Sequence, residues 1–392
     1  MCEINNGMHE REKGFYIHSG SKTKFLGVDK KIQYQIAMLS EHYDMYEIIV
    51  EKDESHTINH ILWCLPGGSW GRLYDNAYTE IMSILHDDIG AHFFYIRSCI
   101  PDMKFISFIK RIKEKFPNSK FLLEIPTYPY SKELIFNKTM WPWFFKDIAN
   151  RKKLARYIDR VVTFSDDDRI FDIDTIKIKN GISVANVLLK GREKWDIQDS
   201  PSVVNLIAVA QFHPVHGYER IVRGLEAYYC SDFEHNKTKV IVHMVGDGKE
   251  KQRYQRLVRQ CGLEKYVIFY GSLAGDRLEE VYNLADIGLG VFGAYKRNIR
   301  ISSALKIREY LAKGLPVVSG VYEDAFPNSN EFFLKFPNNR SVVDIGAIVK
   351  FYKDLNDKYG FNGVKQRIRD YASNNIDISV TMLPVLEYLE KN

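Results

Sequence analysis

Several features that would place this chain in a special class are missing from its 392 residues. The five cysteines are scattered, odd in number and without a CxxC pair, which argues against a disulfide framework and a structural zinc site. Unpaired cysteines fit a reducing compartment, so we expect a cytoplasmic protein. No apolar run approaches the roughly 20 residues that span a bilayer, and the polar residues 1–13 are unlike a signal peptide.

A strong charge bias is also missing. The formal net charge is +5, from 55 basic and 50 acidic residues, which is too small for a typical nucleic-acid binder. It fits an anionic ligand or an anionic membrane surface. Hydrophobic residues make up 45% of the chain, as in ordinary soluble proteins, and the length exceeds that at which one core keeps growing. We therefore expect two domains and see no internal repeat.

Short apolar runs alternate with longer amphipathic stretches along both halves of the chain. This alternation is typical of βαβ units around parallel sheets, so we predict an α/β protein. The expected strands are 14–19, 46–50, 61–65, 93–96, 120–124, 160–164, 175–178, 203–210, 239–245, 267–270, 287–291 and 316–319. The expected helices are 31–41, 74–87, 103–115, 218–229, 249–261, 277–285, 303–313 and 377–392.

The sequence places a domain boundary next to Asn180 and Gly181, two residues that tolerate the backbone of a tight turn. The polar, irregular stretch that follows, 182–202, is expected to be a linker. The predicted domains are residues 1–181 and 182–376, with the apolar helix 377–392 packing back on the first domain.

The segment 295–320, YKRNIRISSALKIREYLAKGLPVVSG, is the most informative part of the chain. Ser302 or Ser303 is expected to cap a helix that ends before Gly314. The free N–H groups and the dipole of the helix start favour an anion such as a diphosphate. Basic residues crowd the same place: Lys296, Arg297, Arg300 and Lys306. A solvated basic loop before an ordinary helix fits this pattern equally well.

These residues resemble a known family. KIREYLAKGLPVV resembles the signature of the retaining GT-B glycosyltransferases of family 4 (glycosyl transferases group 1). The stretches VVNLIAVAQFHPVHGYERIVRGL, VHMVGDGKEKQRYQRLVRQCGLEKYVIFYGSL, LEEVYNLADIGLGVF, KIKNGI, FLGVDKKIQYQIAML and LLEIPTYPY resemble further family segments in the same order. The resemblance implies two Rossmann-like domains facing each other across a cleft. It implies a UDP- or GDP-linked sugar as donor and no required metal or other cofactor.

The chain departs from the family pattern at three positions. Family members usually carry two glutamates eight positions apart; the second, which holds the donor ribose, maps onto Glu309, and the first maps onto Ile301. The usual diphosphate-binding Arg and Lys map onto Gln211 and His216. Either the basic loop replaces the lost charge, or the site no longer transfers sugar. A plain surface pair of Glu309 with Lys313 is the alternative reading of that helix position.

By resemblance, catalytic roles fall to Glu309, Arg300 and Lys296. The residues expected to bind the donor are Gln211, His216, Gly217, Gly246, Asp247, Gly248, Arg297, Ile301, Ser302, Ser303, Ala304 and Leu305. The residues expected on the acceptor side are Gly27, Val28 and His18. The alternative readings are a βα turn that Asp247 caps and a packed strand-end position for His18.

Two further motifs invite a ligand. The acidic triplet at 166–168 resembles the DxD metal motif of GT-A enzymes, but its Ser-Asp context favours a helix cap, so no metal is expected. The WPWFF motif at 141–145 has basic neighbours on both sides, which suits a membrane interface. A helix that packs these aromatic side chains inward fits the motif equally well.

The sequence therefore predicts a cytoplasmic glycosyltransferase, with peripheral attachment to the inner face of the plasma membrane as an option. The resemblance implies transfer from a nucleotide sugar, with retention, to a glycan, glycolipid or protein-linked acceptor in the synthesis of surface polysaccharide or glycoconjugates. A degenerate pseudo-glycosyltransferase that supports another transferase, and a GT-B-like sugar-nucleotide epimerase, stay open as alternatives. No nucleic-acid partner is expected.

Overall fold

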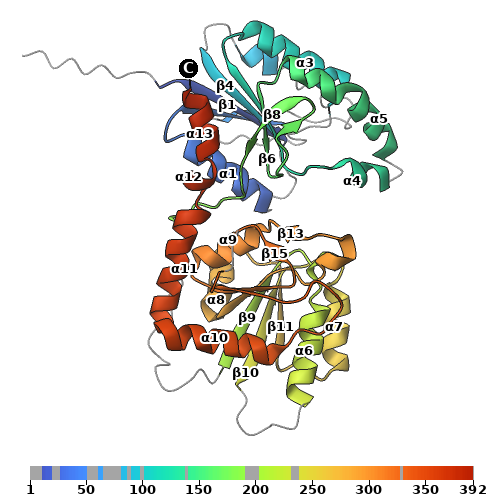
Figure 1. Cartoon of the computed structure of the whole chain (residues 1–392), viewed down its shortest axis with the longest axis vertical. Helices are drawn as coiled ribbons and strands as arrows, with labels where there is room; N and C mark the ends of the chain where they lie inside the picture. Colours follow the sequence, from blue (N-terminus) through green and yellow to red (C-terminus); the bar gives the residue numbers. More distant parts are fainter. Residues whose placement is uncertain are drawn as a thin grey trace, which may run out of the picture. The chain divides into compact units, whose positions relative to one another are not determined.

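The computed structural model describes residues 11–19, 27–50, 61–64, 81–85, 90–97, 101–136, 140–189, 203–230, 238–326 and 330–391. The chain divides into two compact units. The first comprises Met1–Ile178 together with Thr381–Asn392, and the second comprises Lys179–Val380. Figure 1 shows that each unit has a central sheet covered by helices.

The first unit is built on an eight-stranded sheet with the order β3-β2-β1-β4-β5-β6-β8-β7. All strand pairs of this sheet are parallel except the short hairpin of β7 and β8. The strands are β1 (Lys13–Ser19), β2 (Asp44–Val50), β3 (Ile61–Cys64), β4 (Ala91–Arg97), β5 (Lys120–Ile125), β6 (Arg160–Thr163), β7 (Arg169–Ile170) and β8 (Ile173–Lys177). The order reverses between β1 and β4, which makes their carboxyl ends the switch point of a doubly wound fold.

The helices of the first unit are α1 (Gly27–Leu39), α3 (Met103–Lys115), α4 (Ser131–Phe136), α5 (Trp141–Asn150), the 3₁₀ helix η3 (Arg151–Arg156) and α13 (Leu383–Glu390). α3 shows why such a stretch folds as a helix. The Asp102 side chain accepts a hydrogen bond from the amide of Phe105 and caps the first turn. Its apolar face (Phe105, Ile109 and Ile112) is fully buried in the core of the unit.

The second unit has a fully parallel six-stranded sheet with the order β11-β10-β9-β12-β14-β16. These strands are β9 (Val203–Val209), β10 (Lys239–Val245), β11 (Val267–Gly271), β12 (Ile287–Leu289), β14 (Val317–Ser319) and β16 (Phe333–Lys335). A separate parallel pair joins β13 (Ile301–Ser302) to β15 (Tyr322–Glu323). The switch point lies between β9 and β12.

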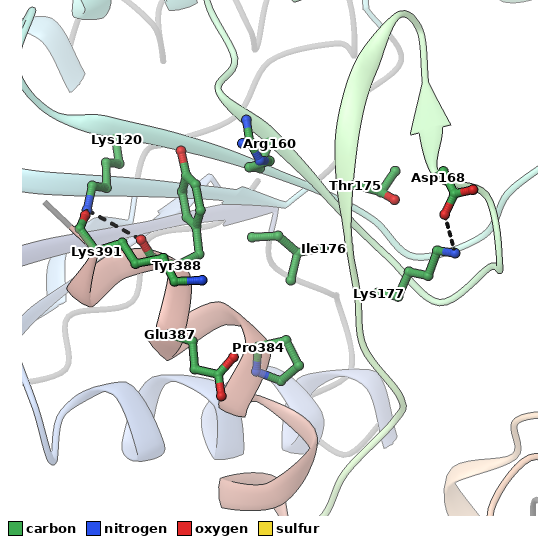
Figure 2. Close-up of a pocket in the computed structure, with 10 residues that line it drawn as sticks. All are labelled: Lys120, Arg160, Asp168, Thr175, Ile176, Lys177, Pro384, Glu387, Tyr388 and Lys391. Carbon is green, nitrogen blue, oxygen red and sulfur yellow. Dashed lines mark hydrogen bonds and ion pairs between the residues drawn. The ribbon is translucent and has the colours of Figure 1, made fainter.

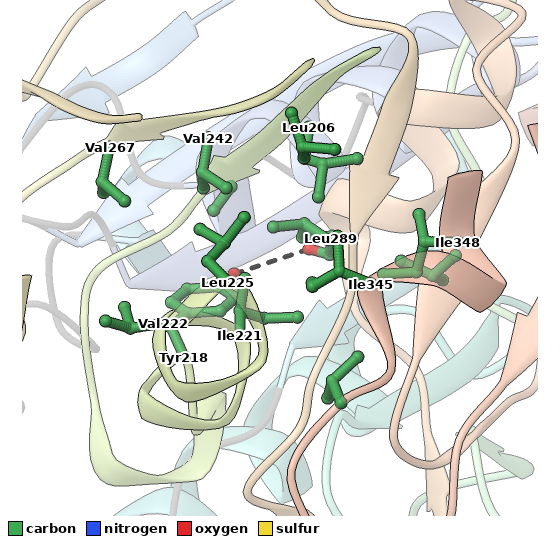
Figure 3. Packing of buried hydrophobic residues seen from close by; sticks show 14 of the residues in the cluster. Leu206, Tyr218, Ile221, Val222, Leu225, Val242, Val267, Leu289, Ile345 and Ile348 are labelled. Atoms are coloured by element: carbon green, nitrogen blue, oxygen red, sulfur yellow. Dashed lines mark hydrogen bonds between the residues drawn. The ribbon is translucent and has the colours of Figure 1, made fainter. Parts of the chain in front are cut away.

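The helices of the second unit are η4 (Pro214–His216), α6 (Glu219–Cys230), α7 (Lys251–Gln260), α8 (Asp276–Leu284), η6 (Ala294–Arg297), α9 (Leu305–Ala312), α10 (Ile345–Tyr359) and α11 (Phe361–Asn375); α12 (Ile378–Thr381) follows at the boundary. Figure 3 shows the core between the sheet and the helices α6 and α10, with Leu206, Val242 and Leu289 on strands facing Leu225 and Ile345 on helices. Burying such side chains stabilises the unit by about 1.5–3 kcal/mol each.

Most predicted strands match the observed ones within two residues at each end, but three helical predictions differ. α1 begins four residues earlier than predicted, at Gly27, α9 begins two residues later, and the predicted helix 377–392 is divided into α12 and α13. The helices α10 and α11 were not anticipated. Most of the predicted helix 74–87, residue 65 and the later part of the predicted linker lie outside the described residues.

The first part of the expected linker is anchored rather than free. Val184 and Val187 are buried, and the Arg369 guanidinium donates to both of their carbonyl oxygens. Ile182 forms a β-bridge with Asp377. The sequence reads as irregular here because its backbone groups bond to helix α11 and to the segment after it rather than to a sheet.

Candidate functional site

The first candidate site is the carboxyl edge of the second sheet at its switch point, where two loops cross. The loop after β9 and the loop after β12 are tied by hydrogen bonds from the amides of Phe292 and Gly293 to the carbonyls of His216 (2.8 Å) and Val215 (2.9 Å). Gly217 adopts a φ of +62°, and a Cβ atom there would strike the backbone of Gly293. Glycine is therefore required for the two loops to meet.

The third loop of this edge is the Gly-Asp-Gly turn after β10. Gly246 and Gly248 have φ values of +128° and +140°, and a Cβ atom on either would collide with the backbone of the β9 loop. The Asp247 carbonyl accepts a hydrogen bond from the Phe212 amide at 2.6 Å. The Asp247 carboxylate accepts from the Gly248 amide and from Lys251, so this side chain stabilises the turn.

The start of α9 differs from the prediction that Ser302 or Ser303 caps it. Its N-cap is Ala304, and no side chain caps the helix. Ser302 is held in the β13–β15 pair, whereas the Ser303 hydroxyl donates to Asp324 (2.7 Å) and accepts from the side-chain Nδ2 of Asn180 (2.9 Å). The capping prediction was wrong because the Ser302 side chain bonds to Glu323 and the Ser303 hydroxyl to Asp324 and Asn180 rather than to the helix start. Leu305 is the first residue of the helix.

The basic loop is less free than its sequence suggests. The Lys296 ammonium pairs with Glu219 at 2.5 Å and donates to the Pro214 carbonyl at 3.0 Å. The side chains of Arg297 and Arg300 are exposed. Ile301, at the position of the family's first glutamate, is 62% exposed. Lys296 is thus engaged in an ion pair, whereas Arg297 and Arg300 present exposed guanidinium groups.

Below this loop lies Lys306, whose ammonium donates to the Tyr218 hydroxyl (2.6 Å) and to the Gly290 carbonyl (2.9 Å). Burial lowers the pKa of Lys306 to about 7, since the charged form loses its water. Burial and the neighbouring Lys306 together lower the pKa of His216 to about 2, so His216 is neutral near pH 7. Its Nδ1 accepts from the His213 amide at 3.0 Å, which leaves the proton on Nε2. His216 can thus donate a hydrogen bond without adding charge. Gln211, in the same loop after β9, is exposed.

Glu309 lies on α9 and is partly buried. Its Oε2 accepts a hydrogen bond from the Tyr282 hydroxyl at 3.1 Å. Lys313, the expected partner in the surface-pair alternative, instead pairs with Glu279 at 2.5 Å. Tyr282 therefore orients the Glu309 carboxylate from the α8 side.

Sequence reasoning missed a buried carboxyl group at this edge. Glu323 on β15 is 1% exposed, and its Oε1 accepts from the Ser319 hydroxyl at 2.9 Å. Burial raises the pKa of Glu323 to about 7, although Ser302 and Ser319 act in the opposite direction. The sequence around it, GVYED, reads as an ordinary polar loop after a strand, so no local signal marks it.

The acceptor-side predictions fall at the carboxyl edge of the first sheet. His18 is 6% exposed, and its Nε2 lies 2.8 Å from Oε1 of Glu47 on β2. Gln33 on α1 donates to the same Glu47 oxygen at 2.8 Å. Gly27 and Val28 begin α1, and Val28 is 44% exposed. The structure therefore joins His18 to a hydrogen-bonded cluster, while Val28 lies on the surface.

A second missed group in the first unit is the network around Glu124, a fully buried carboxylate near the end of β5. Its oxygens accept hydrogen bonds from Tyr95 (2.6 Å), Arg97 (2.6 Å), Gln35 (2.9 Å) and Lys31 (3.3 Å). Lys31 and Arg97 are the main attractive charges that lower the pKa of Glu124 to about 2, although burial acts in the opposite direction. The network carries one more positive than negative charge at the edge where an α/β unit binds ligands.

Across the described residues, no group of three or more His, Cys, Asp or Glu side chains lies close enough together to hold a metal ion. In the acidic triplet 166–168, Asp168 pairs with Lys177 at 2.7 Å and does not cap a helix. Nor does any described helix have the length and apolarity needed to cross a membrane.

The first unit also has an open groove of about 740 Å³ between α13 and the strands β5, β6 and β8 (Figure 2). Lys120 and Arg160 on its wall are the first residues of β5 and β6, so the groove lies at the amino ends of these strands. Three of its basic side chains are already engaged: Lys120 donates to the carbonyl of Leu389, Arg160 lies over the Tyr388 ring, and Lys177 pairs with Asp168. The groove is thus a less suitable ligand site than the carboxyl edge.

Comparisons with known proteins bear on the second unit and on the fold. Residues 204–336, about a third of the chain, match a family model described as glycosyl transferases group 1. No curated protein matches the chain.

Solved structures match nearly the whole chain. HepE of Anabaena, solved with UDP and with UDP-glucose, is 14% and 13% identical, with TM-scores of 0.61 and 0.59; each match covers 96% of this chain and 99% of HepE. Sucrose-phosphate synthase of Thermosynechococcus elongatus is 15% identical over 97% of this chain and 99% of its own, with a TM-score of 0.60. The trehalose-6-phosphate synthase OtsA is 12% identical over 97% of this chain and 99% of its own, with a TM-score of 0.61. These matches confirm the predicted α/β fold of the GT-B class.

Proposed function

We propose that this protein is a glycosyltransferase that moves a sugar from a nucleotide sugar to an acceptor. The observation that carries the proposal is the coincidence of the family match, residues 204–336, with the edge where three glycine-containing loops meet the start of α9. A doubly wound sheet binds its ligand at this edge. The solved complexes of HepE with UDP and with UDP-glucose support a nucleotide sugar as the donor, with UDP or GDP as the nucleotide.

The donor would be held by groups that differ from the usual family set. Arg297 and Arg300 are the exposed cations suited to a diphosphate, and the neutral His216 supplies an Nε2–H donor. No side chain caps the first amides of α9, which favours a negative charge there. Glu309, oriented by Tyr282, would accept hydrogen bonds from the ribose hydroxyls. We assign donor contacts also to Gln211, Gly217, Gly246, Gly248 and residues 301–305.

The reaction needs no metal in this proposal. The chain contributes positioning of the two substrates and stabilisation of the leaving diphosphate by fixed donors and cations. Family resemblance supports retention of the anomeric configuration. The acceptor, a glycan, glycolipid or protein-linked sugar of a surface polysaccharide or glycoconjugate, would be met at the edge formed by His18, Arg97 and Glu124. A lipid-linked acceptor would require peripheral contact with the inner face of the plasma membrane.

Isothermal titration with UDP, GDP, ADP and their common sugars tests the donor site. We expect one nucleotide to bind selectively, and both Glu309→Ala and Arg300→Ala to weaken it at least tenfold, which corresponds to about 1.4 kcal/mol. Arg277→Ala, an exposed arginine on α8, is the matched control and should bind normally. Selective binding that neither site variant weakens would place the nucleotide elsewhere and defeat the assignment.

A second candidate function is that of a degenerate partner of another transferase. It is favoured by the ion pair that occupies Lys296 and by the apolar, exposed Ile301. No binding of any nucleotide would support this alternative. Where a nucleotide sugar binds, incubation with labelled donor and acceptor pools separates transfer from an epimerase reaction, which releases nucleotide without a glycosylated product.

A further inference from the structure

The short helix α5 exposes its apolar face and buries polar side chains, the reverse of an ordinary surface helix. Trp141, Phe145 and Ile148 are spaced four and three residues apart, so they share one face, and that face is exposed. Their exposed fractions are 46%, 63% and 45%. The buried residues of the helix are instead the polar Asp147 and Asn150. A helix that forms only to fill a core would place these two sets the other way round.

The buried polar side chains have hydrogen-bond partners, and the one from outside α5 and η3, Tyr130, holds this face of the helix toward the unit. Asp147 accepts hydrogen bonds from the Tyr130 hydroxyl (2.5 Å) and from Arg151 (3.2 Å). Asn150 donates to the Lys146 carbonyl and accepts from Lys153, at 2.8 and 2.9 Å. Rotating the helix to hide its apolar face would break the bond from Tyr130 and move Asp147 away from it.

Neighbouring elements extend the apolar surface. Ile135 on α4 is 44% exposed and Met103 at the start of α3 is 59% exposed, and both helices contact α5. Figure 1 shows α3, α4 and α5 together at one corner of the first unit. We call these five side chains the α5 patch: Met103, Ile135, Trp141, Phe145 and Ile148. Apolar side chains gathered in this way mark a surface that contacts an apolar partner.

The charge around the patch identifies the partner. Residues 131–156 carry seven basic and two acidic side chains, a net charge of +5 that equals the net charge of the entire chain. The Lys146 ammonium lies 4.8 Å from the Trp143 ring, and Lys152 is 73% exposed and forms a surface ion pair with Asp172 at 3.1 Å. Tryptophan beside lysine is typical of the zone between lipid headgroups and acyl chains. A protein interface of this kind would instead be depleted of lysine.

We infer that the α5 patch docks onto an anionic lipid surface, with Trp141, Phe145 and Ile148 inserted below the headgroups and the surrounding lysines and arginines on the phosphates. Of the two alternatives that the WPWFF motif left open, this inference takes the membrane interface. It deepens the proposed function, because it specifies how the first unit would reach a lipid-linked acceptor. It is nevertheless tested by binding alone, so the loss of transferase activity cannot decide it.

The test is co-sedimentation of the full chain with phosphatidylcholine vesicles that contain or lack phosphatidylglycerol, at low and high salt. We expect binding to the anionic vesicles only, weakened as salt screens the charges. The double variant Phe145→Ser, Ile148→Ser should bind at least about tenfold more weakly. Lys146→Ser with Lys152→Ser should also bind more weakly, with most of the loss at low salt.

Matched controls separate insertion from a general loss of apolar or basic surface. Leu188→Ser with Val342→Ser removes side chains that are 71% and 52% exposed in the second unit, and Lys350→Ser removes a lysine that is 74% exposed. These controls should bind like the wild type, and all variants should melt like it. Equal binding by wild type and the Phe145, Ile148 variant, or no binding at low salt, would overturn the inference. Self-association that this variant abolishes, without lipid binding, would assign the patch to a second copy of the chain.

Discussion

Replacing Glu124 by glutamine removes the one negative charge from a buried network that holds two positive ones. The carboxylate is fully buried and accepts from four side chains, among them Lys31 and Arg97. Glutamine keeps the shape but offers a single acceptor oxygen and leaves both cations without their counter-charge. Removing one partner from a buried ion pair typically costs about 3–5 kcal/mol.

The depressed pKa gives an independent magnitude. A pKa lowered from 4.5 to about 2 corresponds to about 3 kcal/mol of stability, at roughly 1.4 kcal/mol for each tenfold change in proton affinity. Because the folded-state pKa of this carboxyl lies below its unfolded value, the contribution is present above about pH 4.5 and disappears as the pH falls toward 2. The variant should therefore be least stable relative to the wild type at neutral pH and approach it in acid.

Urea unfolding from pH 7 down to pH 3 measures this difference, and hydrogen exchange of peptides from β4 and β5 assigns the transition to the first unit. We expect Glu124→Gln to lose about 3 kcal/mol at pH 7 and about half of that at pH 3. Glu114→Gln, a surface carboxylate that is 63% exposed, is the control and should change stability by less than about 0.5 kcal/mol. A loss below about 1 kcal/mol at pH 7, or one that does not depend on pH, would refute the argument.

Three other substitutions probe the second unit. Gly246→Ala should lower the melting temperature by several degrees, because φ is +128° and the new Cβ atom would strike the Ala210 carbonyl of the β9 loop. The control is Gly262→Ala, where φ is +64° but the space around the residue is open. In thermal melting this control should lose only about 1 kcal/mol of stability. Glu323→Gln should be more stable than the wild type in urea at about pH 8, with the advantage shrinking toward about pH 5. The pKa of this carboxyl rises from 4.5 to about 7 on folding, so its contribution to stability is lost as the pH increases from about 4.5 through about 7. Glu219→Gln should free Lys296 and strengthen nucleotide binding several-fold in calorimetry; unchanged affinity would remove Lys296 from the donor site.

The sequence was sufficient to predict the framework because apolar periodicity and turn chemistry are local properties. Strands β4, β5, β9 and β10 are short runs of buried residues between clear breaks, and Gly314 has the left-handed backbone expected after α9, with a φ of +72°. The helices α10 and α11 were not predicted because their apolar positions are diluted by lysine, asparagine and aspartate. Their stability comes from packing on α6 and α9, which no local pattern reveals.

The polar networks could not be predicted for a different reason. Glu124 is joined to Lys31 across 93 positions and Lys296 to Glu219 across 77 positions, so the pairing depends on which loops the topology brings together. The same limit explains the serine caps. Ser303 has an ordinary cap sequence, but Asp324 and Asn180 reach its hydroxyl from distant segments. Local propensity is outweighed wherever a tertiary partner offers a charge-assisted bond.

These networks bear on whether the altered donor edge is a working one. A site that has lost its ligand has no reason to keep three glycines in conformations that a side chain would block, yet Gly217, Gly246 and Gly248 all have positive φ and close backbone neighbours. Packing of the loops alone could account for them, but it does not account for the exposed Arg297 and Arg300 on the adjacent loop. Two guanidinium groups beside an uncapped helix start can bind a diphosphate in two-point fashion, which a lysine cannot do. We therefore propose that the altered residues reflect a rearranged donor site, which selective nucleotide binding that Arg300→Ala weakens would support and the absence of nucleotide binding would refute.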